Sequence, residues 1–329
     1  MSTVIEHPAK VATPRQASRA NGDRQRKLDA AQRDRLALVD AYDSTAFNWG
    51  EIDWVVTGFL VAMHVGCFAA PFFFSWAALG VCLVLHWLTC SVGICLGYHR
   101  YVSHQSMKLR QPARFLVLAC GAIAGEGSPL NWAATHRLHH QKSDQEGDPH
   151  SPLDEPWWAH ALWLFSSRKN EVQPILYRRY VPELVGQPML KFFERTYALW
   201  LWAVGLTLLA AGWLLGGWKV GLSIFLWGMC VRMTVAYHST WLINSATHLW
   251  GYRNYKTRDE SRNLWWVALL AYGEGWHNNH HAHPSVAPAG HRWWEVDMTW
   301  WVIRALRAVG LAYDVKDRIP AKGSSAGAP

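Results

Sequence analysis

Paired cysteines are missing from this sequence. Its six cysteines include no Cys-x-x-Cys pair, and most of them lie in apolar segments. Disulfide bonds and a cysteine-ligated metal cluster are therefore not expected. We interpret the thiols as reduced packing residues inside the fold. They are Cys67, Cys82, Cys90, Cys95, Cys120 and Cys230.

A secretory signal is also missing. The first 50 residues are polar, and the first apolar run comes too late and is too long for the hydrophobic region of a signal peptide. We therefore expect the protein to remain on the cytoplasmic side of its membrane. No nucleic-acid recognition motif accompanies the basic N-terminal residues, so we expect no nucleic-acid partner.

Apolar residues, in contrast, are abundant. Half of the 329 residues are hydrophobic and 22 are Trp, which is unusual for a soluble globular protein. Four stretches have the length needed to span a bilayer, and they fall at residues 54–74, 75–98, 197–215 and 220–241. Their short junctions predict two hairpins. The predicted fold is an all-α integral membrane protein with four transmembrane helices in two hairpins and a cytoplasmic helical domain.

The charge distribution predicts the orientation in the membrane. Eight Lys and Arg residues lie between positions 10 and 35, and basic segments next to spans stay in the cytoplasm. Both termini are therefore expected there. We divide the chain into a polar arm (residues 1–46, with a possible helix after Asp23), a membrane domain (47–316) and a disordered tail (317–329).

Two further apolar segments do not have the character of spans. Glycines, Glu126 and Pro129 interrupt residues 114–134, so we interpret that segment as a re-entrant or interfacial element. Charged residues interrupt the apolar stripe of residues 293–311, which predicts a helix lying in the interface or against the cytoplasmic domain.

Histidines recur at fixed offsets after the predicted spans. In residues 136–140 and again in residues 277–281, three histidines occupy positions i, i+3 and i+4. On a helix these offsets place three imidazoles on one face, as metal ligands require. One such group could be a solvated surface cluster, but a second with identical offsets argues against that interpretation.

A third pair, His99 and His104, is spaced five residues apart. On a continuous α-helix the two rings would diverge by roughly 140°, so we expect the helix to end or bend between them. Eight histidines exceed the needs of one four-coordinate zinc and predict two metals. The even number of predicted spans between the groups allows all of them to lie on one side of the membrane.

The remaining histidines have no such spacing. His64 and His86 lie within predicted spans, and we interpret them as packed, hydrogen-bonded residues. Five others receive no role: His150, His160, His238, His283 and His291.

The three histidine groups resemble the histidine boxes of the membrane fatty acyl desaturases of the stearoyl-CoA desaturase type, in a bacterial or cyanobacterial-like branch. Four more segments match the family in order: residues 147–152 (Gly-Asp-Pro-His-Ser-Pro), 241–248, 251–253 and 273–276. The resemblance covers about residues 50 to 316. It implies a di-iron oxidoreductase that uses O₂ to insert a cis double bond, usually at Δ9, into a saturated acyl chain during fatty acid biosynthesis.

The resemblance also implies a ninth histidine ligand, His248, and an Asn244 that reaches the second metal through a water. Positions 244 and 248 are i and i+4, so their side chains share a helix face. The expected metal ligands are His99, His104, His136, His139, His140, His248, His277, His280 and His281.

Metal-bound histidines usually donate their second N–H to a carboxylate. Asp144, Asp148 and Glu274 lie within eight residues of box histidines, so we expect them to orient the ligands. The alternative for each is a helix cap or a solvated charge.

One departure from the family concerns the substrate. Acyl-CoA members carry an Arg-Asp pair before the central box, where this chain has Ala134 and Thr135, although Trp132 is retained. The loss favours an acyl-lipid substrate, with Trp132 and Trp241 expected near the cavity mouth. Basic residues before the second hairpin could replace the missing charges, namely Arg168, Lys169, Arg178 and Arg179.

The partners and location follow from the resemblance. No haem-binding or cysteine-cluster motif occurs in the sequence, so a separate electron donor of ferredoxin or cytochrome type is expected. The predicted location is the bacterial inner membrane, with the active site facing the cytoplasm.

Two alternatives remain at this stage. A di-iron membrane hydroxylase shares the first hydrogen abstraction. A histidine-rich membrane metal-binding protein or carrier would have no redox chemistry, but carriers place their ligands near the bilayer midplane, whereas these histidines follow the spans.

Overall fold

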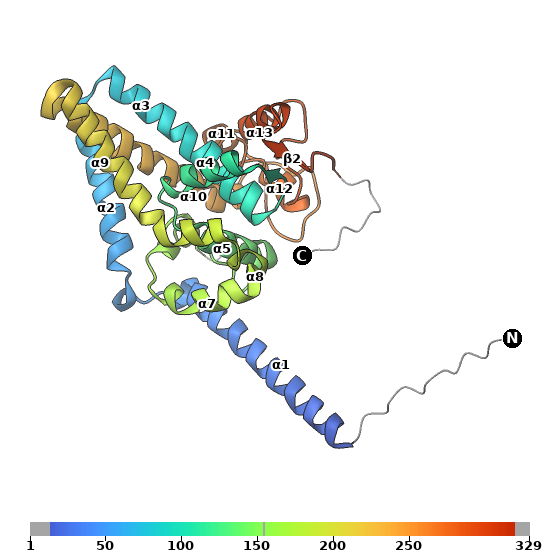
Figure 1. Ribbon diagram of the computed structural model, residues 1–329. Helices are drawn as coiled ribbons and strands as arrows, with labels where there is room; N and C mark the ends of the chain where they lie inside the picture. The colour runs from blue at the N-terminus through green and yellow to red at the C-terminus, as the bar shows by residue number, and fades with distance from the viewer. Residues whose placement is uncertain (1–13, 154, 320–329) are drawn as a thin grey trace.

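The computed structural model describes residues 14–153 and 155–319, with the side chains of the first helix described from residue 25 (Figure 1). Most of the described chain is helical. In chain order the elements are α1 (Pro14–Tyr42), η1 (Ser44–Ala46), η2 (Trp49–Glu51), α2 (Trp54–Ala69), η3 (Ala70–Phe73), α3 (Trp76–Trp87), η4 (Leu88–Ser103), β1 (Lys108–Leu109), α4 (Gln111–Ala122), α5 (Pro129–Lys142), α6 (Pro156–His160), η5 (Leu162–Leu164), α7 (Arg168–Tyr180), α8 (Pro182–Val185), α9 (Pro188–Phe225), η6 (Leu226–Val231), α10 (Arg232–Leu249), α11 (Trp265–Leu270), α12 (His277–Ala282), α13 (Met298–Ala308) and β2 (Ala312–Tyr313).

The first long apolar segment folds into a hairpin whose ends are capped by side chains. Asp53 accepts hydrogen bonds from the first backbone N–H groups of α2, and Ser75 accepts one from the N–H of Ala78 at the start of α3. Large apolar side chains point outward, for example Val55 and Phe72, which are 83% and 86% exposed. Such exposure is unfavourable in water but suits contact with lipid tails.

A second hairpin lies within the stretch from α9 to α10. The backbone of α9 leaves helical geometry at Gly216 and Gly217, and Gly217 has φ 78°, which favours glycine. Beyond this turn the chain runs back, because a Cβ on Gly212 would meet the Cα of Gly221 at 2.7 Å and one on Gly205 would touch Met229. Within the described residues, three helical stretches are long and apolar enough to cross a membrane, Trp54–Phe73, Trp76–Ser103 and Pro188–Leu249, and the third contains this turn.

The turns of the two hairpins lie at the same end of the molecule. The hydroxyl oxygens of Ser75 and Ser223 are 3.1 Å apart, and the indole N–H of Trp227 donates to the Ala70 carbonyl at 3.1 Å. In Figure 1 this end is at the upper left, whereas α5, α7, α8 and α12 lie toward the opposite end.

The segment that carries His99 is a π-helix. In η4 each backbone N–H donates to the fifth preceding carbonyl instead of the fourth, and the N–H of His104 donates to the His99 carbonyl at 3.1 Å. The helix ends at Ser103, within the predicted interval. The two rings converge, however, because the wider π turn brings positions five apart onto one side, which an α-helical count does not anticipate.

The predicted re-entrant segment is a pair of helices, α4 and α5, joined by a turn with positive φ at Gly125 and Gly127. Two backbone carbonyls just after α4 accept hydrogen bonds from α10: the buried Arg232 donates to Ile123 at 3.0 Å, and Tyr237 donates to Gly125 at 3.1 Å. An irregular turn is thus enclosed by protein, as a non-aqueous environment requires.

The N-terminal helix is attached to this core. α1 begins at Pro14, earlier than the predicted helix after Asp23, and residues 1–13 of the predicted arm lie outside the described residues. Its last turn buries Leu38 and Tyr42 in a cluster that includes α5 and α7 side chains. Arg178 pairs with Asp34 at 2.7 Å. The predicted arm boundary at residue 46 therefore falls after these contacts.

The C-terminal segment packs beside η4. In the predicted segment 293–311 the helix α13 covers Met298–Ala308, and its Ile303 is buried against Leu96. β1 and β2 pair antiparallel, with Lys108 opposite Tyr313, a small sheet that the all-helical prediction did not contain. Of the predicted tail, residues 320–329 lie outside the described residues.

Candidate metal centre

The nine histidines expected as ligands form two adjacent clusters. In each cluster the ligand nitrogens lie within 4.8 Å of one another. The five-histidine cluster contains His99, His104, His136, His140 and His280, and the four-histidine cluster contains His139, His248, His277 and His281.

Two helices contribute to both clusters. α5 supplies His136 and His140 to the five-histidine cluster and His139 to the four-histidine cluster. α12 supplies His280 to the five-histidine cluster and His277 and His281 to the four-histidine cluster. The three rings of a box therefore do not share one site, because the 100° offset between adjacent helical residues turns i+3 and i+4 toward different neighbours.

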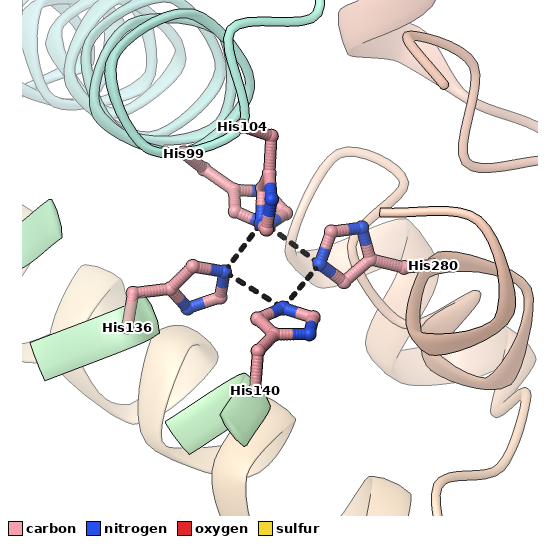
Figure 2. Close-up of side chains that lie close together, drawn as sticks. All are labelled: His99, His104, His136, His140 and His280. Carbon is pink, nitrogen blue, oxygen red and sulfur yellow. Dashed lines mark hydrogen bonds between the residues drawn. The ribbon is translucent and has the colours of Figure 1, made fainter. Parts of the chain in front are cut away.

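The five-histidine cluster has imidazole nitrogens that converge on a common region (Figure 2). The Nε2 atoms of His104 and His136 are 2.7 Å apart, those of His136 and His140 are 3.0 Å apart, and His140 lies 2.9 Å from His280. A neutral imidazole whose Nδ1–H donates elsewhere presents a lone pair at Nε2. His99 is such a ring, because its Nδ1 lies 2.9 Å from Glu274. Converging lone pairs suit a shared cation.

The four-histidine cluster also presents imidazole nitrogens that are available to a cation. The buried Nε2 atoms of His139 and His281 have no hydrogen-bond partner among the described residues, and the Nε2 atoms of His248 and His277 are 3.1 Å apart. Buried nitrogens without partners are unfavourable unless something binds them. The donor set of these residues therefore fits a metal ion.

Carboxylates lie behind four of the rings. Asp148 is 2.8 Å from Nδ1 of His139, and Asp144 is 2.9 Å from Nδ1 of His248. With Glu274 beside His99, the structure thus places all three expected carboxylates against box histidines. Each contact fixes the tautomer and the orientation of its ring.

A fourth carboxylate was missed by the sequence reasoning. Asp259 lies 3.0 Å from Nδ1 of His281 and is itself 6% exposed. It belongs to the irregular segment between α10 and α11, 22 residues before its partner. Such a separation gives no periodic signal in a sequence.

Burial keeps the imidazoles neutral and their partners charged. Loss of hydration lowers the pKa of His136, His140, His277 and His280 well below the usual value. Burial alone would raise the pKa of Glu274, but the charge of Arg100 and the hydrogen bond from His99 lower it to about 2. His139 differs, because Asp148 overcomes burial and raises its pKa. Neutral imidazoles are the form that binds metals.

A buried ion-pair network connects the first box to the C-terminal segment. Arg100, next to His99, donates to Glu274 at 2.9 Å and to Asp297 at 2.9 Å. Asp297 also accepts hydrogen bonds from the backbone N–H groups of Ala289 and Trp300. These bonds hold η4, the loop before α12 and α13 together around His99.

The two asparagines inside the third box support its short helix. Asn279 accepts hydrogen bonds from Asn254 and Asn263 and donates to Ala289 and Glu295. Asn278 is also fully buried and bonds the 254–257 segment. Because α12 is only six residues long, these bonds compensate for its weak intrinsic stability.

A cavity with about 560 Å³ of empty space reaches both clusters. His99 and His136 line it from one cluster and His139 and His277 from the other, while the remaining lining is largely apolar. The other lining residues include Cys90, Ile94, Cys95, Trp132, Ser239, Thr240, Ile243, Asn244 and Ala271.

Glu126 connects two walls of this cavity. Its carboxylate accepts hydrogen bonds from the Trp132 indole at 3.1 Å and from the Thr240 hydroxyl at 2.9 Å. The Trp132 ring stacks on His136 at a centroid distance of 4.9 Å. Burial raises the pKa of Glu126 to about 7.

Of the two tryptophans expected near the cavity mouth, Trp132 lines the cavity and Trp241 does not. Trp241 stacks on Tyr237 and contacts His238 instead. The reason is helical geometry: Thr240 and Ile243 face the cavity, and position 241 points to another side of α10.

His64, His86, His160 and His238 are packed and hydrogen-bonded, whereas Nδ1 of the buried His150 has no hydrogen-bond partner among the described residues. His64 and His238 share a contact of 3.2 Å between their Nε2 atoms, and His238 continues to His160 at 3.0 Å. His86 bonds the Tyr272 hydroxyl at 2.8 Å, in agreement with the packing interpretation. His150 lies beside His139, with ring centroids 4.3 Å apart.

Comparisons with known proteins agree with this geometry. Residues 42–316 match the family model described as fatty acid desaturase. The chain is 41% identical to an sn-2 palmitoyl-lipid 9-desaturase of Nostoc sp. (strain 36), over 83% of this chain and 93% of the relative. It is 43% identical to an sn-1 stearoyl-lipid 9-desaturase of Anabaena variabilis, over 81% and 94%. An acyl-CoA C20 Delta5-desaturase of Anemone leveillei is 37% identical over 82% and 83%.

Neither the hydroxylase nor the metal-carrier alternative is favoured by these comparisons. With the family model covering most of the chain, and with two imidazole clusters meeting at one apolar cavity, the protein belongs to the fatty acid desaturase family and is an oxidoreductase that introduces double bonds into fatty acyl chains.

Proposed function

We propose that this protein is an O₂-dependent Δ9 desaturase of acyl lipids with a di-iron centre. The observation that carries the proposal is the cavity lined by histidines of both clusters and by apolar side chains. The relatives named as lipid 9-desaturases support the position of the double bond and the lipid substrate. The experiment below tests both.

The eight box histidines and His248 would hold the two iron ions, with Asn244 contributing through a water. Bound iron supplies the redox chemistry with O₂ that removes hydrogen from an unactivated C–H bond. Asp144, Asp148, Asp259 and Glu274 keep four imidazoles in one orientation and tautomer. Any movement of these rings would misplace the reacting groups.

The acyl chain binds in the cavity beside the rings. Ile94, Ile243 and Ala271 offer apolar contact and exclude water, while Trp132 and Thr240 define opposite walls held by Glu126. The spacing between these walls fixes which methylene groups of the acyl chain lie against the two clusters. Packing in the cavity therefore selects the position of the double bond along the acyl chain.

The head group is a glycerolipid rather than coenzyme A. Phosphate groups need unpaired Arg or Lys side chains, and Ala134 and Thr135 are both uncharged and buried. Of the possible substitutes, Arg168 pairs with Glu51 and Asp40, and Arg178 pairs with Asp34. Arg179 has no carboxylate partner among the described residues, but it borders a crevice beside Leu138 and Lys142 and does not line the histidine-lined cavity. Lys169 lies over the Trp163 ring with its Nζ buried.

The protein crosses the bacterial inner membrane four times, with its termini and both clusters in the cytoplasm. The two hairpins support this topology, since their turns lie at one end of the molecule, whereas α5 and α12, which carry histidines of both clusters, lie toward the other (Figure 1). A separate ferredoxin- or cytochrome-type protein supplies the electrons.

The test is expression in a host that lacks a desaturase, with pulse-labelled saturated fatty acid and gas chromatography of each lipid class over time. We expect a Δ9 cis product that appears first in membrane glycerolipids. If labelled unsaturated acyl-CoA precedes unsaturated glycerolipid, the head-group assignment is wrong. If hydroxylated chains accumulate instead, the reaction assignment is wrong.

A further inference from the structure

Desaturation requires electrons from outside the protein. The balanced reaction, R–CH₂–CH₂–R′ + O₂ + 2e⁻ + 2H⁺ → R–CH=CH–R′ + 2H₂O, takes two electrons from a donor for each double bond. The sequence has no cysteine-cluster or haem-binding motif that could store them. A redox protein must therefore bind close enough to the clusters to transfer an electron.

Four basic side chains from four parts of the chain form a patch near the five-histidine cluster. We define the basic patch as Arg35 of α1, Lys142 at the end of α5, Arg179 of α7 and Arg258. The first three border a crevice with an apolar lining that includes Leu38, Val39 and Leu138. The fourth, Arg258, is connected to this crevice through Gln141. The Gln141 side chain accepts a hydrogen bond from the hydroxyl of Tyr180, a crevice residue, at 2.6 Å, and the Gln141 backbone carbonyl accepts one from Arg258 at 3.0 Å.

The patch is positively charged because its members lack acidic partners. Among the described residues, none of the four has a carboxylate within ion-pair distance. Nearby acidic groups are used by other cations: Asp34 by Arg178, and Glu183 by Arg137. The exposed Glu146 lies beside Gly147 of the crevice. Four cations and this single carboxylate leave the surface positive.

The patch is also close to metal-binding side chains. Arg258 is exposed, yet it donates to the backbone carbonyl of His140 at 2.7 Å. Leu138 of the crevice lies between His136 and His139 on α5. A protein that touches Arg258 is thus one residue from a ring of the five-histidine cluster, and that ring is itself only partly buried.

We infer that an acidic one-electron carrier protein docks on the basic patch and delivers electrons to the five-histidine cluster through α5. This inference rests on the proposed desaturation. Positive charge around an apolar crevice steers and orients a negatively charged partner. A bilayer is the poorer occupant, because strongly exposed tryptophans, which mark the membrane interface, lie on other elements: Trp49, Trp54 and Trp157.

The test compares a protein donor with a small one. Purified, iron-loaded enzyme in neutral-lipid nanodiscs receives electrons either from a reduced acidic [2Fe–2S] ferredoxin or from dithionite, and product is measured by gas chromatography. The variant is Arg35→Glu/Arg179→Glu, since neither side chain touches a box histidine. The matched control is Arg304→Glu, an exposed arginine of α13.

For the double variant we expect the KM for ferredoxin to rise about tenfold or more at low ionic strength, with a weaker salt dependence. Iron content and dithionite-driven turnover should stay within about twofold of the unaltered enzyme. Charges at the rim of an interface mainly change the rate of association with a protein partner, and dithionite needs no such association. The control should keep the original KM.

An unchanged KM in the double variant, or an equal rise in the Arg304→Glu control, would overturn the docking surface. So would a defect that is seen in anionic vesicles and disappears in neutral nanodiscs, because the patch would then bind lipid. Failure of the unaltered enzyme with both reductants would instead contradict the proposed function itself.

Discussion

At the scale of single residues, the carboxylates behind the imidazoles are the groups through which the protein tunes its metal centre. Asp259 is the informative one, because it contacts His281 from a distant part of the chain. Replacing such a partner typically lowers metal affinity or activity by about 10- to 100-fold. It does so without removing a ligand.

We therefore expect Asp259→Asn to lose iron from the four-histidine cluster and to form about tenfold or more less product. Metal analysis and gas chromatography check this outcome. Glu260→Gln is the matched control, since the Glu260 side chain pairs with Arg253 and Arg262 and contacts no box histidine. Full iron content and activity in Asp259→Asn would show that His281 needs no orienting partner.

Glu126 should make the stability of the folded protein depend on pH with a sign opposite to that expected from the carboxylates paired with histidine. Burial raises its pKa from 4.5 to about 7, so between these pH values the folded state keeps a proton that the unfolded state releases. Stability should fall as pH rises from about 4.5 to 7, by an amount on the order of 3 kcal/mol.

Glu126→Gln removes this titration and keeps one acceptor for Trp132 or Thr240. In detergent, the melting temperature of the unaltered protein should decrease more between pH 5 and 7.5 than that of the variant. Parallel curves for the two proteins would mean that Glu126 is ionised throughout this range.

Prediction from sequence succeeded at this scale where residues are close in the chain. The offsets within residues 136–140 and 277–281 are local, so helical geometry alone brings those rings near one another. Asp259 and the partners of Asn279 escaped prediction, because they come from irregular segments whose contacts have no period. Which side of α10 lines the cavity, Thr240 and Ile243 but not Trp241, could not be predicted because the orientation of α10 about its axis depends on packing.

At the scale of elements, the hairpin turn within α9 depends on a single glycine. Gly217 has φ 78° and ψ −177°, a region that other residues rarely adopt and that costs them about 1–3 kcal/mol. No atom lies within 4 Å of a Cβ placed there, so a substitution there acts through backbone strain alone.

Gly217→Val should therefore lower the melting temperature in detergent and reduce the yield of membrane-inserted protein. Gly58→Ala is the control, because its Cβ would also meet nothing within 4 Å but its backbone is helical. If both variants behave like the unaltered protein, the hairpin turn is able to adopt another conformation.

Hydrophobic runs predicted the apolar helices and their hairpins, because length and polarity are local properties. The π-helix η4 was not predictable in this way. Residues 88–103 show no feature that separates five-residue from four-residue hydrogen bonding, and the choice is made by contacts with α4 and α13. The pairing of β1 with β2 joins segments about 200 residues apart. The sequence contains no local pattern that would predict this pairing or its register.

At the scale of the whole molecule, topology decides whether the clusters can form. Reporter fusions after Phe74 and Gly217 should be located on the far side of the membrane, and fusions after His104 and Gly251 in the cytoplasm. The two hairpin turns share one end of the molecule, which is the reason for this expectation. A cytoplasmic reporter at Gly217 would contradict the second pair of spans.

The division of α5 and α12 between the two clusters has a consequence for how the enzyme is assembled in the cell. Neither helix can be fixed for one ion without being fixed for the other, so the first ion to bind orders the walls of the neighbouring site. The second ion then binds with less loss of conformational entropy, which makes loading cooperative. A metal titration of the apoprotein should accordingly be sigmoidal, with few half-loaded molecules, and two separated affinities would contradict it. Iron shortage would then divide the population into fully active and inactive enzymes, and membrane fluidity would respond to iron supply as a threshold.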